Sequence, residues 1–191
     1  MEENFVEGKK EKEESCRPLI RDAGRYGLDG TSGQELREFN RLYKRLDDLY
    51  HSLSLKMGMS DSTFIILYTI AELGDGCSQK EICEQVSISK QTINSSIRKL
   101  EGSGVIRLEK GTRGRELHIL LTEAGKRIIR EKIYPIMEAE DRAFTHMPAE
   151  DRAEFLRLSR LYVDEMICQT RPFLSEEELS LIHISEPTRR S

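Results

Sequence analysis

Hydrophobic and polar residues alternate between positions 78 and 122 in an order that predicts two short helices, a β-hairpin and the beginning of another helix. Ser78 is followed three residues later by Glu81, which is the spacing of a capping box, so we expect a helix from Gln79 to about Val86. A three-residue link then leaves room only for a tight turn. Its last residue, Ser89, can cap a second helix that begins at the next position.

The second helix is amphipathic. At about 100° per residue, Ile93, Ile97 and Leu100 fall within a narrow stripe, and the opposite face is polar. Glutamine and asparagine can pair with base edges, and lysine and arginine with guanine or phosphate, so this face suits a major groove. Any surface helix has a polar outer face, which is the alternative interpretation. The residues predicted to contact DNA here are Ser89, Lys90, Gln91, Thr92, Asn94, Ser95, Arg98 and Lys99.

A basic hairpin should follow. Gly102 and Gly104 end the helix, and short strands are expected at 105–108 and 116–121. The segment between the strands is rich in glycine and cations, so its natural partner is polyanionic backbone or a narrow minor groove. The alternative is a solvated loop whose charges serve solubility. The predicted wing contacts are Lys110, Arg113 and Arg115, and the order of elements is that of a winged helix-turn-helix.

This stretch resembles the DNA-binding lobe of the multiple antibiotic resistance regulator (MarR) family of transcription factors. The resemblance rests on SKQTINSSIRKLEGSGVI, on the wing, and on LTEAG at 121–125, where the family has a leucine-threonine pair with glycine three positions on. It implies that Arg115 enters the minor groove. The family commonly has an acidic residue two places earlier, where this chain has Arg113, so the usual wing ion pair is unavailable. Arg113 is instead a candidate phosphate contact.

An apolar seam precedes this lobe. From Gln34 the apolar residues are spaced by alternating threes and fours, as in a coiled coil, at Leu36, Phe39, Tyr43, Leu46, Tyr50, Leu53 and Met57. One winged helix has too little surface to cover this seam, so another helix should do so. The resemblance implies a dimerisation lobe built from the first and last helices, while intramolecular core is the alternative. The predicted dimerisation residues are Leu36, Phe39, Tyr43, Phe155, Leu158 and Tyr162.

Three further helices complete the pattern. Residues 60–73 are apolar nearly all round, which indicates the helix at the centre of the subunit. A long helix is expected from Glu123 to about Phe144, with a kink at Pro135. A last long helix should begin after Pro148 and stop at Pro172.

The predicted fold class is mainly α with a small β-wing, comprising a winged helix-turn-helix lobe and helical dimerisation arms. We expect a disordered or loosely attached extension at 1–33, a dimerisation helix at 34–59, the winged lobe at 60–122, C-terminal dimerisation helices at 123–170 and a tail at 171–191. The final SLIHISEPTRRS does not match the preceding pattern, so we treat it as a candidate cloning or assembly scar.

Composition changes this picture only in detail. With 191 residues and 37% hydrophobic content, the chain can form one domain with tails, and its net charge of −4 argues against nucleic-acid binding. That average is misleading, because residues 87–115 hold seven lysines and arginines against two glutamates, or 7 − 2 = +5. No segment has the roughly 18 consecutive apolar residues of a membrane span, and the N-terminus lacks a signal-peptide pattern, so a cytoplasmic protein is expected.

The predicted function is a homodimeric transcription factor that binds a palindromic operator. A repressor is favoured because a bound dimer can block polymerase without extra contacts, and activation stays open. In the family an effector often binds the crevice between the arms and the winged lobe. The candidate walls of that pocket are Phe39, Tyr43, Tyr50 and Phe64, for which simple packing is the alternative.

Other classes of function are less well supported. The four histidines are isolated, and no HExxH, GxSxG or P-loop motif is present, so no enzyme, metal site or cofactor is predicted. A protein-interaction module with the same fold is one alternative. Cysteine-based redox sensing is another, since Cys77 precedes a capped helix and is the best placed of four cysteines that show no disulfide framework.

Overall fold

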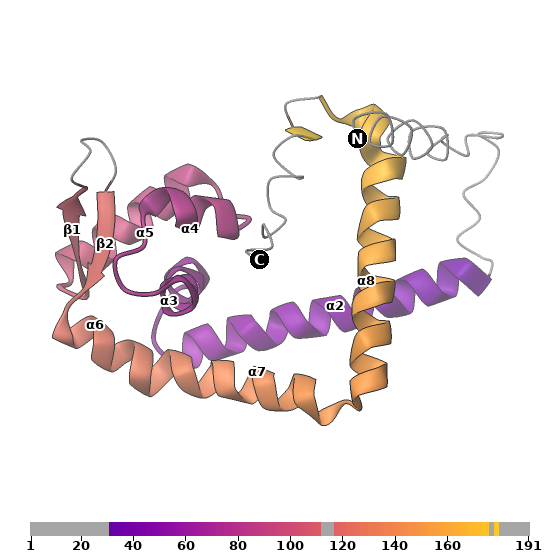
Figure 1. The fold of residues 1–191 in the computed structure, drawn as a ribbon, viewed down its shortest axis with the longest axis horizontal. Coiled ribbons are helices and arrows are strands. Elements are labelled where there is room, and N and C mark those ends of the chain that lie inside the picture. Colours follow the sequence, from indigo (N-terminus) through magenta and orange to yellow (C-terminus); the bar gives the residue numbers. More distant parts are fainter. Residues whose placement is uncertain (1–30, 112–116, 176–177, 180–191) are drawn as a thin grey trace, which may run out of the picture. The chain divides into compact units, whose positions relative to one another are not determined.

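The computed structural model describes residues 31–111, 117–175 and 178–179. The chain divides into two compact units, of which one spans Asp29–Phe144 and the other joins Thr145–Ser191 with Met1–Leu28. The first unit contains α2 to α7 and the two-stranded wing (Figure 1). The fold is therefore mainly helical with a small antiparallel sheet, as the sequence predicts.

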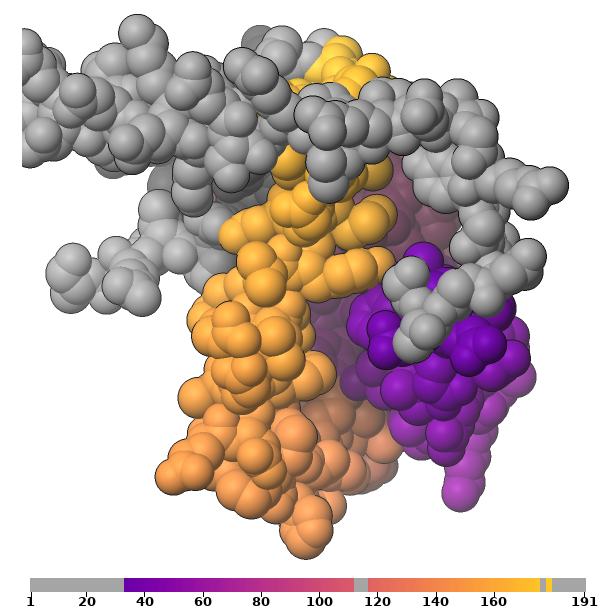
Figure 2. Space-filling view, turned by 90° about the vertical axis from the view of Figure 1, so that its right-hand side faces the viewer, coloured from indigo at the N-terminus to yellow at the C-terminus, as the bar shows by residue number. Residues whose placement is uncertain are grey.

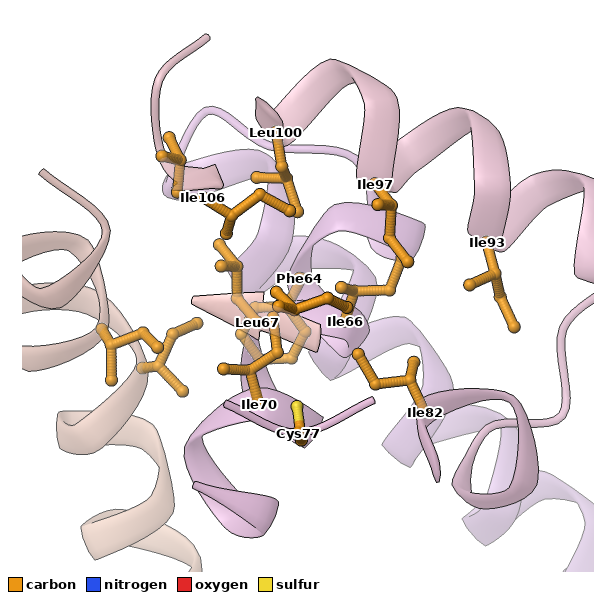
Figure 3. Packing of buried hydrophobic residues seen from close by; sticks show 14 residues of the cluster. Phe64, Ile66, Leu67, Ile70, Cys77, Ile82, Ile93, Ile97, Leu100 and Ile106 are labelled. Atoms are coloured by element: carbon orange, nitrogen blue, oxygen red, sulfur yellow. The ribbon is translucent and has the colours of Figure 1, made fainter. Parts of the chain in front are cut away.

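Helix α3 (Asp61–Leu73) lies at the centre of this unit and contacts α2, α4, α5 and the π-helical turn η1 (Figure 1). The helix begins where the side chain of Ser60 accepts a hydrogen bond from the backbone of Thr63. Ile66, Leu67 and Ile70 are almost completely buried, and side chains from several elements converge on them (Figure 3). The predicted central helix is confirmed.

Helices α4 (Gln79–Gln85) and α5 (Lys90–Gly102) begin at the predicted caps. At α4 both halves of the capping box are present: the Ser78 hydroxyl accepts from the Glu81 backbone N–H, and the Glu81 carboxylate accepts from the Ser78 N–H at 2.7 Å. At α5 the Ser89 hydroxyl accepts from the backbone N–H of Thr92 at 3.1 Å. These bonds satisfy N–H groups that a helix leaves without internal partners, which fixes where each helix starts.

The wing consists of β1 (Ile106–Lys110) and β2 (Leu117–Leu121), paired antiparallel with Ile106 opposite Leu121. Both strands were predicted, with bounds shifted by one or two residues. The other edge of β2 is bonded to the segment before α4. There the Ile119 N–H donates to the Cys77 carbonyl at 2.8 Å, and the Ile119 carbonyl accepts from the Gly76 N–H at 2.9 Å. The base of the wing is therefore held from both sides.

The segment after the wing is helical throughout, as α6 (Glu123–Ile128), η1 (Ile129–Ile133) and α7 (Tyr134–His146). A kink was predicted at Pro135, and the structure has a π-helical turn that ends at Ile133, two residues before this proline. Proline lacks an N–H group, and its ring crowds the carbonyl four residues earlier, so a widened turn accommodates it. The turn also directs Ile129 and Ile133 into the core.

Helix α2 (Thr31–Lys56) begins at Thr31, within the predicted N-terminal extension, and its apolar seam is largely exposed. Helix α8 (Ala149–Thr170) follows Pro148 as predicted, and the short helix η2 (Arg171–Phe173) succeeds it. No residue of α8 is buried, and its side chains stand at the surface (Figure 2). The role of these two helices in dimerisation stays a prediction.

Gly125 lets α6 pack tightly against the base of the wing. The Thr122 hydroxyl caps α6 by accepting from Gly125 N–H at 3.1 Å, and it also lies within hydrogen-bonding distance of the Val105 carbonyl, at 3.0 Å. A Cβ atom added at Gly125 would stand 2.2 Å from that same carbonyl oxygen. Such a distance is too short for any side chain, so glycine is required here by close approach of two backbones.

Gly125→Ala should therefore lower the free energy of unfolding by about 1–3 kcal/mol, since the backbone must shift to relieve the clash. Urea denaturation followed by circular dichroism measures this. Gly102→Ala is the matched control, because nothing lies within 4 Å of its Cβ position, and a helical alanine should be neutral or stabilise by up to about 1 kcal/mol. Equal effects of the two substitutions would contradict this account.

The capping box should make stability depend on pH. The backbone N–H of Ser78, followed by its hydroxyl, lowers the pKa of the Glu81 carboxyl below its usual 4.5. The stabilisation by ionised Glu81 is thus present above the unfolded-state pKa and is lost as pH falls through the lower folded-state value. Glu81→Gln should cost about 0.5 kcal/mol at pH 7, a small amount because the group is exposed to solvent.

This difference between wild type and Glu81→Gln should shrink as the pH falls below 4.5, in thermal melts at matched ionic strength. Glu84→Gln, on the same helix and ion-paired only with Lys80 at 3.6 Å, is the control. A difference that stayed constant down to pH 3 would show that the charge of Glu81 plays no part.

Candidate nucleic-acid interface

Helix α5 is fixed in the lobe by one apolar face. Ile93, Ile97 and Leu100 are buried against α3, as predicted (Figure 3). Ser96 also lies on this inner face, 3% exposed, and its hydroxyl donates to the Ser62 hydroxyl of α3 at 3.0 Å. The sequence pattern does not single out Ser96, because a serine next to a polar stripe gives no sign that it is buried. The inner face thus fixes which residues point outward.

The outer face of α5 presents the predicted contact set. Ser89 is the cap, and the other seven residues lie on the outer surface of α5. All eight are exposed: Ser89, Lys90, Gln91, Thr92, Asn94, Ser95, Arg98 and Lys99. Ser95 donates back to the Thr92 carbonyl at 2.9 Å, and Ser89 and Thr92 share a hydroxyl hydrogen bond of 2.8 Å. Exposure is what groove contact requires, whereas contact with DNA itself stays a prediction.

Asn94 is held in place by the preceding helix. Gln79, the first residue of α4, donates from its side-chain amide to the side-chain oxygen of Asn94. This bond uses one of the two lone pairs of the Asn94 oxygen, so the side chain is less free to turn for bidentate pairing with adenine than an unbonded asparagine would be. Sequence analysis missed Gln79, because its partner lies fifteen residues away. The only feature of the sequence that could have indicated a role for Gln79 is its position just after the capping serine, Ser78.

Cations on this side of the lobe are available to a partner. Lys90, Arg98 and Lys99 have no ion-pair partner within the described ranges, and each is exposed. Arg107 on β1 is instead paired with Glu109 at 3.0 Å. Lys110 is exposed at the end of β1, beside the wing tip. The other predicted wing contacts, Arg113 and Arg115, lie outside the described residues.

The predicted dimerisation residues are exposed within their own units. On α2 the exposed fractions are 43% for Leu36, 45% for Phe39 and 61% for Tyr43, and on α8 Phe155, Leu158 and Tyr162 are also exposed. Further apolar side chains on α2, Leu42, Leu46 and Leu49, are about half exposed. Large apolar side chains in such number on one helix are unusual at a surface that stays in water.

A cavity of about 560 Å³ lies among α2, α3 and α7. Two of the four predicted pocket residues, Tyr50 and Phe64, line it. Phe39 and Tyr43 do not, because they lie further toward the N-terminus of α2, where their rings are tilted by 31° with centroids 6.4 Å apart. All four aromatics were predicted to line a crevice between the arm and the lobe. The sequence did not show how far α2 extends beyond the lobe.

The cavity wall includes a carboxylate that sequence analysis missed. Glu140 of α7 accepts hydrogen bonds from the hydroxyls of both Tyr50 of α2 and Tyr68 of α3. Burial, followed by the bond to Glu140, raises the pKa of Tyr50 to about 12, and the same causes raise the pKa of Tyr68. Both hydroxyls thus stay protonated and donate. Nothing in the sequence around Glu140 distinguishes it from neighbouring glutamates.

The cysteines differ in their surroundings. Cys77 is 7% exposed, and burial, then the charge of Glu81, raises the pKa of its thiol to about 11. Burial also raises the pKa of Cys83. A thiol reacts through its thiolate, so both residues are poorly suited to redox sensing. Cys168, by contrast, is disulfide-bonded, which the cysteine spacing did not indicate.

Across the described ranges, histidine, cysteine, aspartate and glutamate side chains do not gather in any group of three that could hold a metal ion. None of the helices in those ranges combines the length and the apolar character needed to cross a bilayer.

Comparison with known proteins agrees with the geometry of the lobe. Residues 57–116 match the model described as "MarR family". The chain is 24% identical to the uncharacterised HTH-type transcriptional regulator YwoH of Bacillus subtilis over 108 residues, which are 56% of this chain and 78% of that protein. It is 26% identical to the HTH-type transcriptional repressor Rv2887 of Mycobacterium tuberculosis over 103 residues, 53% of this chain and 73% of the relative.

The fold is also found in solved structures. The PcaV transcriptional regulator of Streptomyces coelicolor, in complex with its natural ligand, aligns with a TM-score of 0.51 at 21% identity, covering 74% of this chain and 97% of PcaV. The matched model is that of the MarR family, and the two relatives are named as HTH-type regulators of transcription. The capped α4 and α5, the two-stranded wing and these matches agree: residues 57–116 match the MarR family, and this part of the chain is similar to its winged helix-turn-helix transcriptional regulators.

Proposed function

We propose that this protein is a repressor that binds a palindromic operator as a homodimer, with α5 in the major groove and the wing in the minor groove. The observation that carries the proposal is the outer face of α5, where exposed hydrogen-bonding side chains lie beside cations without ion-pair partners in the described ranges. Base edges in the major groove are read by such groups, and phosphates are bound by such cations.

Capping supports this mode of binding. The turn before α5 is short, and the Thr92 N–H in the first turn of the helix is bonded to the Ser89 hydroxyl, so the helix begins at a fixed place. A recognition helix contacts bases mainly through its N-terminal part, and Gln91 and Asn94 lie in that part. Their exposure, together with the anchoring of Asn94 by Gln79, favours a defined set of contacts over loose electrostatic attraction.

Dimerisation is supported by the exposed apolar side chains of α2, since a second copy could cover them. A twofold dimer would present two α5 helices to half-sites separated by about one helical turn of DNA, or 10–10.5 base pairs. Repression is supported by the relative from Mycobacterium tuberculosis, which is named a repressor. The cavity among α2, α3 and α7 supports control by a small molecule, as does the structure of PcaV with its natural ligand.

Selection of bound sequences from a randomised DNA duplex library tests the binding mode directly. We expect a recovered motif with twofold symmetry and half-sites about 10–10.5 base pairs apart. An asymmetric motif, or recovery of no motif, would contradict the homodimeric operator complex.

Arg98→Ala and Lys99→Ala should each weaken binding to the selected duplex and reduce the slope of log affinity against log salt by about one unit, if each side chain contacts phosphate. Fluorescence anisotropy between 50 and 200 mM salt, roughly the range over which such contacts are resolved, measures the slope. Arg130→Ala, an exposed cation on η1 outside the predicted contact set, is the control and should leave the slope unchanged.

The salt dependence of DNA affinity also distinguishes the operator-binding repressor from the main alternative, a winged-helix module that binds another protein. The affinity of such a module for any DNA duplex would not fall steeply with salt, and Arg98→Ala would not change the weak binding that remained.

Redox regulation through Cys77 is disfavoured by its burial, which gives a further prediction. With a pKa of about 11, the Cys77 thiol should react with iodoacetamide at pH 8 at least tenfold more slowly in the native protein than after unfolding in urea. Mass spectrometry of the peptide that contains Cys77 follows the reaction. Rapid native labelling, together with loss of operator affinity after peroxide treatment, would restore the redox hypothesis.

A further inference from the structure

We propose that the cavity among α2, α3 and α7 binds an organic cation with an aromatic or apolar body, whose positive charge lies against the Glu140 carboxylate. This inference rests on the proposed control by a small molecule and specifies the chemical class of that molecule. It is carried by the shape, rings and charges of the cavity wall.

The wall offers a continuous aromatic surface. The rings of Tyr50 and Phe64 have centroids 6.4 Å apart, and those of Phe64 and Tyr68 are 6.1 Å apart. Ile65 and Ile88 extend this surface with aliphatic groups. Aromatic faces carry partial negative charge and attract cations within about 6 Å, most strongly where water is partly excluded. A volume of about 560 Å³ is enough for a small organic molecule.

The charge of the wall is negative. Three acidic residues, Asp47, Asp61 and Glu140, are among the described residues that line the cavity, and no lysine or arginine is. His51 is the one basic side chain there, and it is hydrogen-bonded to Asp61 at 2.8 Å. An anionic aromatic acid would meet unbalanced repulsion in such a site, whereas a cation would neutralise it.

Glu140 is the focus of this negative charge. It is partly buried, and its two described partners, the hydroxyls of Tyr50 and Tyr68, are neutral donors, one to each carboxylate oxygen. The charge is therefore solvated by hydrogen bonds without being neutralised. Each oxygen keeps a lone pair for a further donor or a cation. Partial desolvation, and then the charge of Glu140, also raise the pKa of the Glu72 carboxyl.

A ligand at this position would contact the helices that matter for regulation. Tyr50 belongs to α2, which carries the exposed apolar seam, and Tyr68 belongs to α3, against which α5 packs. A cation that draws Glu140 away from either tyrosine changes the hydrogen bonds joining α2, α3 and α7. Binding is thereby coupled to the angle between the arm and the lobe.

Isothermal titration calorimetry of the full chain with three small aromatic molecules tests the proposal. Benzyltrimethylammonium supplies a cation, benzyl alcohol a neutral molecule and phenylacetate an anion on a similar ring. We expect the cation to bind at least tenfold more tightly than phenylacetate, with benzyl alcohol between them. Tighter binding of the anion, or equal binding of all three, would overturn the assignment.

Substitutions then locate the site. Glu140→Gln keeps the shape of the side chain, removes its charge and should weaken binding of benzyltrimethylammonium about tenfold, as expected for loss of one desolvated ionic contact. Glu138→Gln is the matched control, because this exposed glutamate lies on the same helix and pairs with Arg142 at 3.7 Å instead of lining the cavity. It should leave the affinity unchanged, and an equal loss in both variants would contradict the proposal.

Asp47→Asn provides a second variant, which leaves the Tyr50–Glu140–Tyr68 hydrogen bonds intact. It should weaken cation binding about two- to threefold, because it removes only the electrostatic attraction of the Asp47 charge. It keeps the proposal testable if Glu140→Gln fails to fold, which circular dichroism would show. No loss of cation affinity in Asp47→Asn, with none in a folded Glu140→Gln, would reject the site. Because all of these titrations are done without DNA, failure of the operator model and failure of the cation site are separate outcomes.

Discussion

Burial of α3 is the constraint on which the other parts of the lobe depend. Its side chains are apolar nearly all round, so neighbouring elements must cover several of its faces. The elements that contact α3 are α2, α4, α5 and η1. Ile66, Leu67 and Ile70 are almost completely buried among these elements. The outward direction of α5 follows from this packing, because burying Ile93 and Ile97 leaves Arg98 and Lys99 facing solvent.

The wing is coupled to the same core through hydrogen bonds of the backbone. A two-stranded sheet alone is marginally stable in water. Here Ile119 is buried, and its backbone is bonded to the segment just before α4, while Thr122 and Gly125 bring α6 against the Val105 carbonyl. The helix-turn-helix and the base of the wing therefore form one structure, and a groove-spanning interface needs that fixed relation between them.

Local signals predicted the lobe well, and distant contacts were the part they missed. Ser78, Ser89 and the stripe of Ile93, Ile97 and Leu100 act within one or two helical turns, so their roles can be read from spacing, and the structure confirms them. Gln79–Asn94 and Tyr50–Glu140–Tyr68 join residues far apart in the chain. No periodicity encodes such pairs, which is why two of the predicted pocket aromatics fall outside the cavity and Glu140 was not foreseen.

The distribution of charge links the two proposed sites. The chain is acidic overall, with a formal net charge of −4. Within the described lobe, α5 nevertheless carries cations that have no ion-pair partner. Acidic residues are instead found at the cavity. Concentrating positive charge on one face gives the surface that phosphates require, while the acidic remainder limits non-specific attraction to DNA. In the proposed ligand site, where Glu140 is partly withdrawn from water beside aromatic rings, the same acidic remainder would favour a cation. One asymmetry of charge would then serve both proposals, with DNA phosphates at the basic surface and a cationic ligand at the acidic cavity.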